Sequence, residues 1–165
     1  VLMVQREEVS IGEFKISRSP DHILYVDRLS TGVVLIAFDP VAKVGGIVYT
    51  IVPSSMVVTG MMKEGTEGQY ADLAIPKFMD AFFEAGGQKS ETVLHMMGGA
   101  QMFNFGGGGG NALNIGSRIA ITIRTALSRL GMTVSRAEIG GNKVRTVEFN
   151  IGTGQVDLLF VGDNG

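Results

Sequence analysis

Few side chains of this sequence could perform covalent chemistry. The 165 residues include two histidines, His22 and His95, and neither cysteine nor tryptophan. Without cysteine there is no thiol nucleophile, no thiolate metal ligand and no disulfide. Two histidines leave little room for a histidine-rich metal centre, so we expect no metal and no other cofactor. The nucleophiles left to consider are hydroxyls, which need an adjacent base to react at neutral pH.

A run of five glycines, from Gly106 through Gly110, is the other feature with chemical potential. A glycine-rich loop before a helix can bind phosphate through backbone N–H groups. A P-loop, however, continues with lysine and serine or threonine, whereas Asn111 and Ala112 follow here. We interpret the run as a flexible connector and keep nucleotide or small-molecule binding as the weaker alternative.

Length and composition favour one folded domain spanning residues 1–165. Hydrophobic residues make up 45% of the chain, and 14 Lys and Arg face 16 Asp and Glu, for a net charge of −2. This balance argues against a nucleic-acid footprint, which needs clustered positive charge. No apolar run approaches the ~18 residues of a membrane span, and the first residues lack a signal-peptide pattern. We expect a soluble, cytoplasmic protein.

The elements that must position any site alternate between strands and two helices. Val9 to Ile16 alternate imperfectly around Gly12, which predicts one strand with a bulge. Further strands are predicted at residues 22–29, 32–38, 44–52 and 92–97, with a hairpin turn at Asp39-Pro40. Glycine-containing turns separate residues 133–139, 143–151 and 155–161, which predicts a three-stranded meander.

Two helices complete an α/β domain with seven to nine strands. An apolar stripe from Ile75 to Phe83 predicts the first helix, in which Pro76 requires either a kink or a separate turn over residues 70–74. A second stripe from Ile115 to Leu130 predicts the other helix, with Asn114 as its N-cap. Residues 54–69, between strand and helix, are interpreted as a mobile surface loop, with a lid or a partner contact as the alternative.

Six motifs occur in order along nearly the whole chain. They are Asp39-Pro-Val-Ala-Lys-Val-Gly-Gly46, a strand ending in Ile51-Val-Pro53, Tyr70-Ala-Asp72, Gly98-Gly-Ala-Gln-Met-Phe103, Asn114-Ile-Gly-Ser-Arg118 and Gly140-Gly-Asn-Lys-Val-Arg-Thr-Val-Glu-Phe-Asn150. With them the chain resembles the CheD family of chemoreceptor glutamine deamidases. The resemblance implies a three-layer α/β/β sandwich with two main helices and mixed or antiparallel sheets. It also implies activity on glutamine side chains of chemoreceptor helices and binding of CheC-type phosphatases.

The resemblance also implies which positions would carry the chemistry. The family uses a cysteine nucleophile, a histidine base and a threonine that orients the histidine. Counted from the matching motifs, these positions fall on Gly32, Tyr49 and Val26. None of the three residues can replace its counterpart, so no catalytic residue of the family is retained.

Two functions follow from the resemblance, beside the weaker alternative of nucleotide or small-molecule binding. The first is a catalytically inactive CheD-like protein that binds chemoreceptor cytoplasmic helices or a CheC-type phosphatase. The alternative is an active amidohydrolase with a relocated hydroxyl nucleophile at Thr31 or Ser30, which would need a base within hydrogen-bond reach. We expect His22 and His95 to be ordinary strand histidines.

Several other residues have a binding interpretation beside a structural one. Phe103, with Met102, is the candidate for an exposed apolar partner contact, whereas Met96 and Met97 can equally belong to the core. Arg118, Arg145 and Glu148 could form an internal ion pair or contact a receptor, and a solvated or structural role is the default for them.

Overall fold

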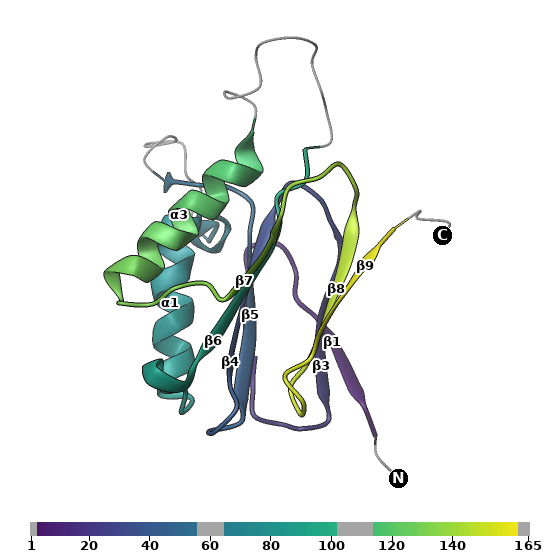
Figure 1. The fold of residues 1–165 in the computed structure, drawn as a ribbon, viewed down its shortest axis with the longest axis vertical. Helices are drawn as coiled ribbons and strands as arrows, with labels where there is room; N and C mark the ends of the chain where they lie inside the picture. The colour runs from purple at the N-terminus through teal and green to yellow at the C-terminus, as the bar shows by residue number, and fades with distance from the viewer. Residues whose placement is uncertain (1–2, 56–64, 102–113, 162–165) are drawn as a thin grey trace.

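The computed structural model describes residues 3–55, 65–101 and 114–161. Its elements form three layers: two helices, a five-stranded sheet in the middle and a four-stranded sheet on the far side (Figure 1). One buried hydrophobic cluster lies between the helices and the middle sheet, and a second lies between the two sheets. The expected α/β/β sandwich is therefore confirmed.

The middle sheet is built around two strands that are buried on both faces. Its order is β2 (Phe14–Ser17), β5 (Val44–Thr50), β4 (Val33–Asp39), β6 (Val93–Gly98) and β7 (Arg136–Ile139). Burial of β4 and β5 on both faces explains why both read as continuous apolar runs. They form the predicted antiparallel hairpin, and the Asp39 carboxylate closes its turn by accepting hydrogen bonds from the N–H groups of Val41 and Ala42.

The outer sheet has the order β1 (Gln5–Glu8), β3 (His22–Leu29), β8 (Arg145–Asn150) and β9 (Val156–Phe160). The prediction of one bulged strand around Gly12 is wrong. The chain leaves β1 in the outer sheet, turns at Gly12 with φ +79° and enters β2 in the middle sheet. The phase slip marks a crossing between sheets, where a left-handed backbone conformation favours glycine.

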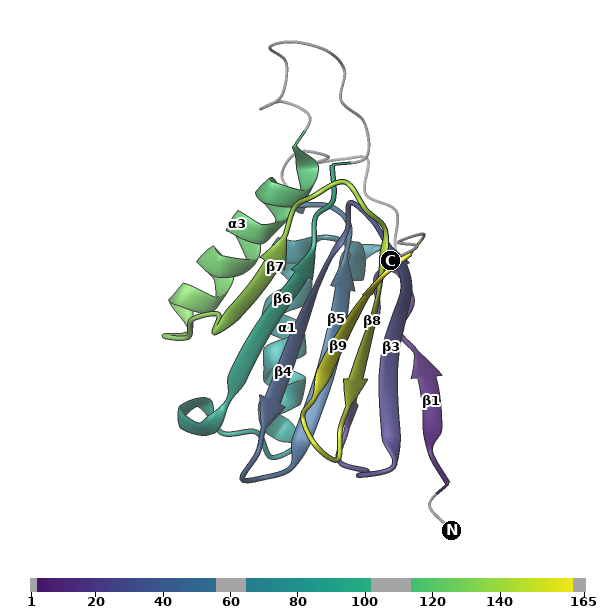
Figure 2. The ribbon, with the colours of Figure 1, turned by 45° about the vertical axis from the view of Figure 1, so that its right-hand side comes forward.

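The predicted three-stranded meander at the C-terminal end is also only partly right. β8 and β9 pair as an antiparallel hairpin, but β7 joins the middle sheet and runs parallel to β6 (Figure 2). The N–H of Gly140 donates to the carbonyl of Gly98, which holds the chain at the middle sheet until it crosses to β8.

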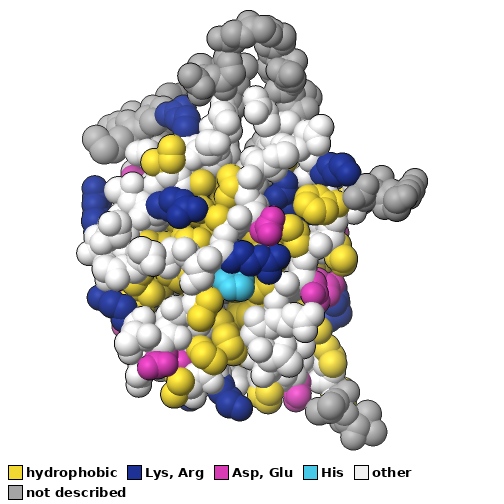
Figure 3. Space-filling model, in the orientation of Figure 1, with side chains coloured by type: hydrophobic (Ala, Val, Ile, Leu, Met, Phe, Trp, Pro, Cys, Tyr) yellow, Lys and Arg dark blue, Asp and Glu magenta, His cyan; other side chains and the backbone are white. Residues whose placement is uncertain are grey.

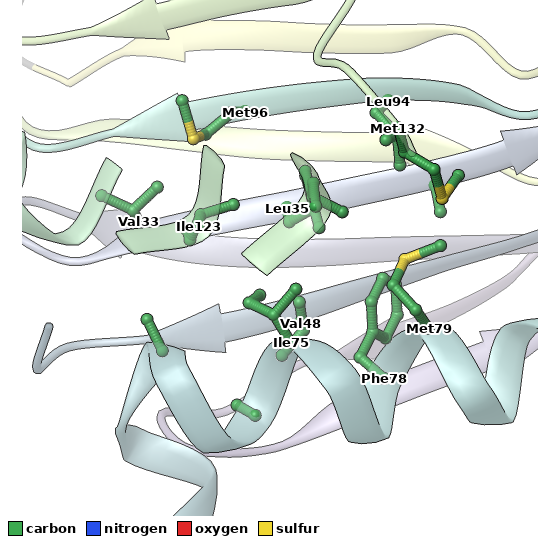
Figure 4. Packing of buried hydrophobic residues seen from close by; sticks show 14 of the residues in the cluster. Val33, Leu35, Val48, Ile75, Phe78, Met79, Leu94, Met96, Ile123 and Met132 are labelled. Carbon is green, nitrogen blue, oxygen red and sulfur yellow. The ribbon is translucent and has the colours of Figure 1, made fainter. Parts of the chain in front are cut away.

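Both helices pack on the middle sheet. α1 (Ala71–Glu84) buries Ile75, Phe78, Met79 and Phe82, and Figure 4 shows three of these side chains directed at the strands. The helix is continuous through Pro76, so residues 70–74 form no separate turn. α3 (Ile115–Arg129) is capped as predicted, because Oδ1 of Asn114 accepts a hydrogen bond from the N–H of Ser117 at 3.2 Å. None of the described helices is long and apolar enough to cross a membrane.

Candidate functional site

Gly32 and Tyr49 meet at the point where β4 begins and β5 ends. Gly32 directly precedes β4, and Val33, the first residue of β4, pairs with Thr50 of β5. A Cβ atom on residue 32 would lie 2.7 Å from Cε1 of Tyr49 and 3.0 Å from the carbonyl oxygen of Thr50. The Tyr49 ring thus occupies the space that a side chain at position 32 would need.

The backbone of Gly32 is also enclosed from the side of β6. Its carbonyl accepts a hydrogen bond from the N–H of Gly99 at 2.8 Å, and the carbonyl of Ser30 accepts one from Ala100 at 2.8 Å. A Cβ on Gly98 would collide with the Gly32 carbonyl, and Gly98 has φ +120°. The Gly98-Gly99 motif is therefore a close backbone approach to the strand entry.

Val26 belongs to the outer sheet and shares a hydrophobic cluster with Tyr49 of the middle sheet. It lies in β3, pairs with Val147 of β8 and is almost completely buried. Val26 and Tyr49 are both members of the cluster between the sheets. The structure thus brings two of the three positions into contact and places the third in the same cluster.

The residues at these three positions are all buried. Gly32 has no side chain, and Val26 is a hydrocarbon. Tyr49 is 7% exposed, and burial raises the pKa of its hydroxyl above the ordinary value of 10.0. The phenol therefore stays protonated at neutral pH and cannot act as a general base there.

The two alternative nucleophiles stand beside this filled position. Ser30 is half-buried and Thr31 is exposed, both in the short connection between β3 and β4. Within residues 3–55, 65–101 and 114–161, neither hydroxyl has a hydrogen bond to a histidine or a carboxylate. The base that a hydroxyl nucleophile needs is not supplied by the described residues.

His22 is engaged at the other end of the sandwich. β2 pairs with β5 so that Ser17 lies opposite Gly45, five residues before Thr50, a separation of about 17 Å along the strand. There Nδ1 of His22 lies 2.6 Å from Oγ of Ser17, and Nε2 lies 2.8 Å from Oε1 of Gln5.

Nothing in the local sequence predicts this contact, because Ser17 and Gln5 belong to no recognisable motif. With Gln5 accepting from Nε2–H, the Ser17 hydroxyl donates to Nδ1. Ser17 is 9% exposed, and its Oγ also accepts from the N–H of Ser19 at 3.0 Å. The group joins β1, β2 and β3, and the only signal for it was a serine and a histidine at adjacent strand ends.

His95 lies in β6, paired with Arg136 of β7. Its Nδ1 is buried without a hydrogen-bond partner among the described residues. Burial lowers the pKa of His95 below 6.5, and the nearby positive charge of Arg136 lowers it further. His95 is therefore a neutral strand histidine, and its Nδ1 has no hydrogen bond to a hydroxyl of the described residues.

Of the methionines and charged residues considered above, Met96, Met97, Glu148 and Arg145 take structural places, whereas Arg118 is exposed on α3. Met96 and Met97 are fully buried, one in each hydrophobic cluster. Glu148 pairs with Arg6 at 2.6 Å rather than with Arg145. Arg145 is 3% exposed and donates to the carbonyls of Glu138 and Gly140, so it braces the connection between β7 and β8.

Three candidates cannot be placed. Met102, Phe103 and the glycines from Gly106 through Gly110 lie outside the described residues. Among the described residues, no group of three or more His, Asp or Glu side chains could hold a metal ion.

Comparison with known proteins identifies the family. The family model described as "CheD chemotactic sensory transduction" matches residues 52–159. A "Probable chemoreceptor glutamine deamidase CheD" of Desulforamulus reducens is 34% identical over 155 residues, which cover 94% of this chain and 90% of the relative. A protein of the same name from Symbiobacterium thermophilum is 33% identical over 156 residues, covering 94% and 93%. The chain belongs to the CheD family.

Proposed function

We propose that this protein is a CheD-family member that has lost glutamine deamidation and acts by binding. Its partners would be chemoreceptor cytoplasmic helices, a CheC-type phosphatase or both, which places the protein in the cytoplasm. The observation that carries the proposal is the Tyr49 ring in the place where a side chain at position 32 would lie.

The surroundings of Gly32 support the same reading. Deamidation of glutamine needs a nucleophile that attacks the carboxamide carbon and a base that takes the proton of the nucleophile and delivers it to the leaving ammonia, after which water releases the glutamate. Position 32 offers no nucleophile, and the neutral phenol of Tyr49 is no base. The scaffold around them is nevertheless well packed, with Val26, Tyr49 and Val147 in one buried cluster. A retained fold with lost chemistry favours a binding role.

The decisive experiment follows deamidation directly. The purified protein is incubated with chemoreceptor cytoplasmic fragments that contain glutamines in their helices. Ammonia release and the mass gain of about one dalton that accompanies conversion of an amide to an acid are measured. We expect no turnover above the buffer blank, with saturable binding to the same fragments or to a CheC-type phosphatase. Turnover above the blank contradicts the loss of catalysis.

The alternative function keeps the enzyme activity with Thr31 or Ser30 as nucleophile. The exposure of Thr31 favours it over an entirely buried site. If turnover is found, Thr31→Ala and Ser30→Ala variants test this alternative. Loss of turnover in one variant assigns the nucleophile, and unchanged turnover in both removes the alternative.

A further inference from the structure

The helix α3 carries an unbalanced positive charge. Its sequence includes Arg118, Arg124 and Arg129 and no acidic residue, in a chain whose net charge is −2. All three arginines are exposed, and no carboxylate of the described residues lies within 4.0 Å of their guanidinium groups. Dark blue side chains lie over this helix in Figure 3. In the part of the chain that the structure describes, these three cations have no counterion and are available to a partner.

An exposed apolar side chain lies between two hollows on the same helix. Ile121 is 62% exposed and lines both a cavity of about 340 Å³ toward α1 and one of about 360 Å³ toward β7. Arg129 borders the first cavity, and Arg124 borders the second. The Ile121 side chain thus stands between two cavities, one bordered by Arg129 and the other by Arg124.

From this arrangement we propose that α3 is a docking surface for an acidic amphipathic helix of a protein partner. Helices pack by fitting the side-chain ridges of one into the grooves of the other, and α3 presents a ridge with grooves on both flanks. Apolar side chains of the incoming helix enter the hollows beside Ile121, and its carboxylates meet the three arginines.

The charge around α3 favours a single helix over an extended polyanion. The neighbouring α1 carries Asp72, Asp80 and Glu84 against one Lys77. Asp72 lines the cavity toward α1, and its carboxylate accepts hydrogen bonds from the N–H and the hydroxyl of Ser55. A membrane surface or a nucleic acid would face these acids as well as the arginines, whereas a single helix can place one acidic stripe over the arginines of α3 and keep its carboxylates away from α1.

Docking on α3 is independent of whether the Gly32 position deamidates, because α3 contributes no residue to that position. To test docking on α3, the probe is a synthetic amphipathic helix with a leucine stripe flanked by glutamates. Matched peptides replace the glutamates by glutamine or lysine. Fluorescence anisotropy is expected to show the glutamate peptide bound about tenfold more tightly than the glutamine peptide, with affinity falling as salt rises. Equal binding of the lysine peptide overturns the proposal.

Variants localise the surface. We expect Arg124→Glu and Ile121→Asp each to weaken binding of the glutamate peptide about tenfold. Lys77→Glu makes the same charge change on α1 and is expected to alter binding less than twofold. Circular dichroism verifies that each variant is folded, and Arg129→Glu provides a second charge reversal on α3. Equal losses in the α3 and Lys77 variants, or tighter binding to phosphatidylserine vesicles or duplex RNA than to the peptide, contradict the proposal.

Discussion

Gly32 and Tyr49 are coupled by the volume they share. A glycine at the entry to a buried strand has no intrinsic advantage, because it loses more conformational entropy than other residues and contributes no packing. Here a Cβ at position 32 would lie 2.7 Å from the ring of Tyr49, so the tyrosine requires the glycine. Replacing one residue alone should therefore disturb the site more than replacing both.

The first prediction measures this coupling. We expect Gly32→Cys to lower the free energy of unfolding by about 1–3 kcal/mol, because the new side chain overpacks a buried site. In the background of Tyr49→His, where the bulky ring is gone, the same change should cost less. Urea unfolding of the two single variants and the double variant gives the coupling energy, expected at about 0.5 kcal/mol or more.

Thr31→Cys is the control for this cycle, since it introduces the same side chain at the adjacent exposed position. It should change stability by no more than about 0.5 kcal/mol. Strictly additive single-variant effects would mean that the ring and the side chain at position 32 do not compete for space.

At the scale of elements, a close backbone contact sets the position of α3. Gly116, in the first turn of the helix, lies against Gly99, and a Cβ on Gly116 would collide with the Gly99 backbone. Gly99 in turn donates to the carbonyl of Gly32. The start of α3 is thereby linked to the strand entry through Gly99.

The second prediction sets helix propensity against this contact. Alanine is favoured over glycine by about 1 kcal/mol inside a helix. We nevertheless expect Gly116→Ala to destabilise the protein by about 1–3 kcal/mol, because the colliding atoms are backbone and cannot rotate away. Thermal or urea unfolding measures the change. Ser128→Ala, at an exposed position of α3, is expected to be neutral or slightly stabilising, and a stabilising Gly116→Ala would disprove the contact.

The patterns that the sequence predicted well are local ones. The strand at residues 22–29, the hairpin about Asp39 and the Asn114 cap depend on neighbours within a few residues, and all three are confirmed. The two errors concern which sheet a strand joins. Gly12 and the Gly140-Gly141 turn resemble a bulge and a hairpin loop locally, yet both mark crossings between sheets that long-range pairing decides.

The candidate site also has features that the sequence could predict and features that depend on long-range pairing. The resemblance to the family implied that positions 32 and 49 would matter, and the structure brings them into contact. That the Tyr49 ring fills the position could not be predicted, because it depends on how β4 and β5 pair and on the side-chain rotamer. The Ser17–His22 contact was missed for a similar reason, since it requires β1, β2 and β3 to converge.

At the scale of the whole molecule, the two hydrophobic clusters share one sheet. Alternate residues of β4 face opposite sides, with Val33, Leu35 and Ala37 in the cluster under the helices and Val34 and Ile36 in the cluster between the sheets. If either the helices or the outer sheet detached from the middle sheet, one apolar face of β4 would become exposed to water. We therefore expect all three layers to unfold together, as one domain.

The last prediction tests that cooperativity with one substitution in each cluster. Phe78 is fully buried between α1 and the middle sheet, and Phe149 is fully buried between the sheets. Replacing either by alanine should cost about 3–5 kcal/mol. If the layers unfold together, Phe149→Ala lowers the hydrogen-exchange protection of α1 amides by the same free energy as that of β3 amides. Phe78→Ala likewise lowers the protection of β3 amides by as much as that of α1 amides. If Phe149→Ala lowers protection in the outer sheet alone and leaves α1 unchanged, the outer sheet opens on its own. The middle sheet and the helices would then retain their packing without it.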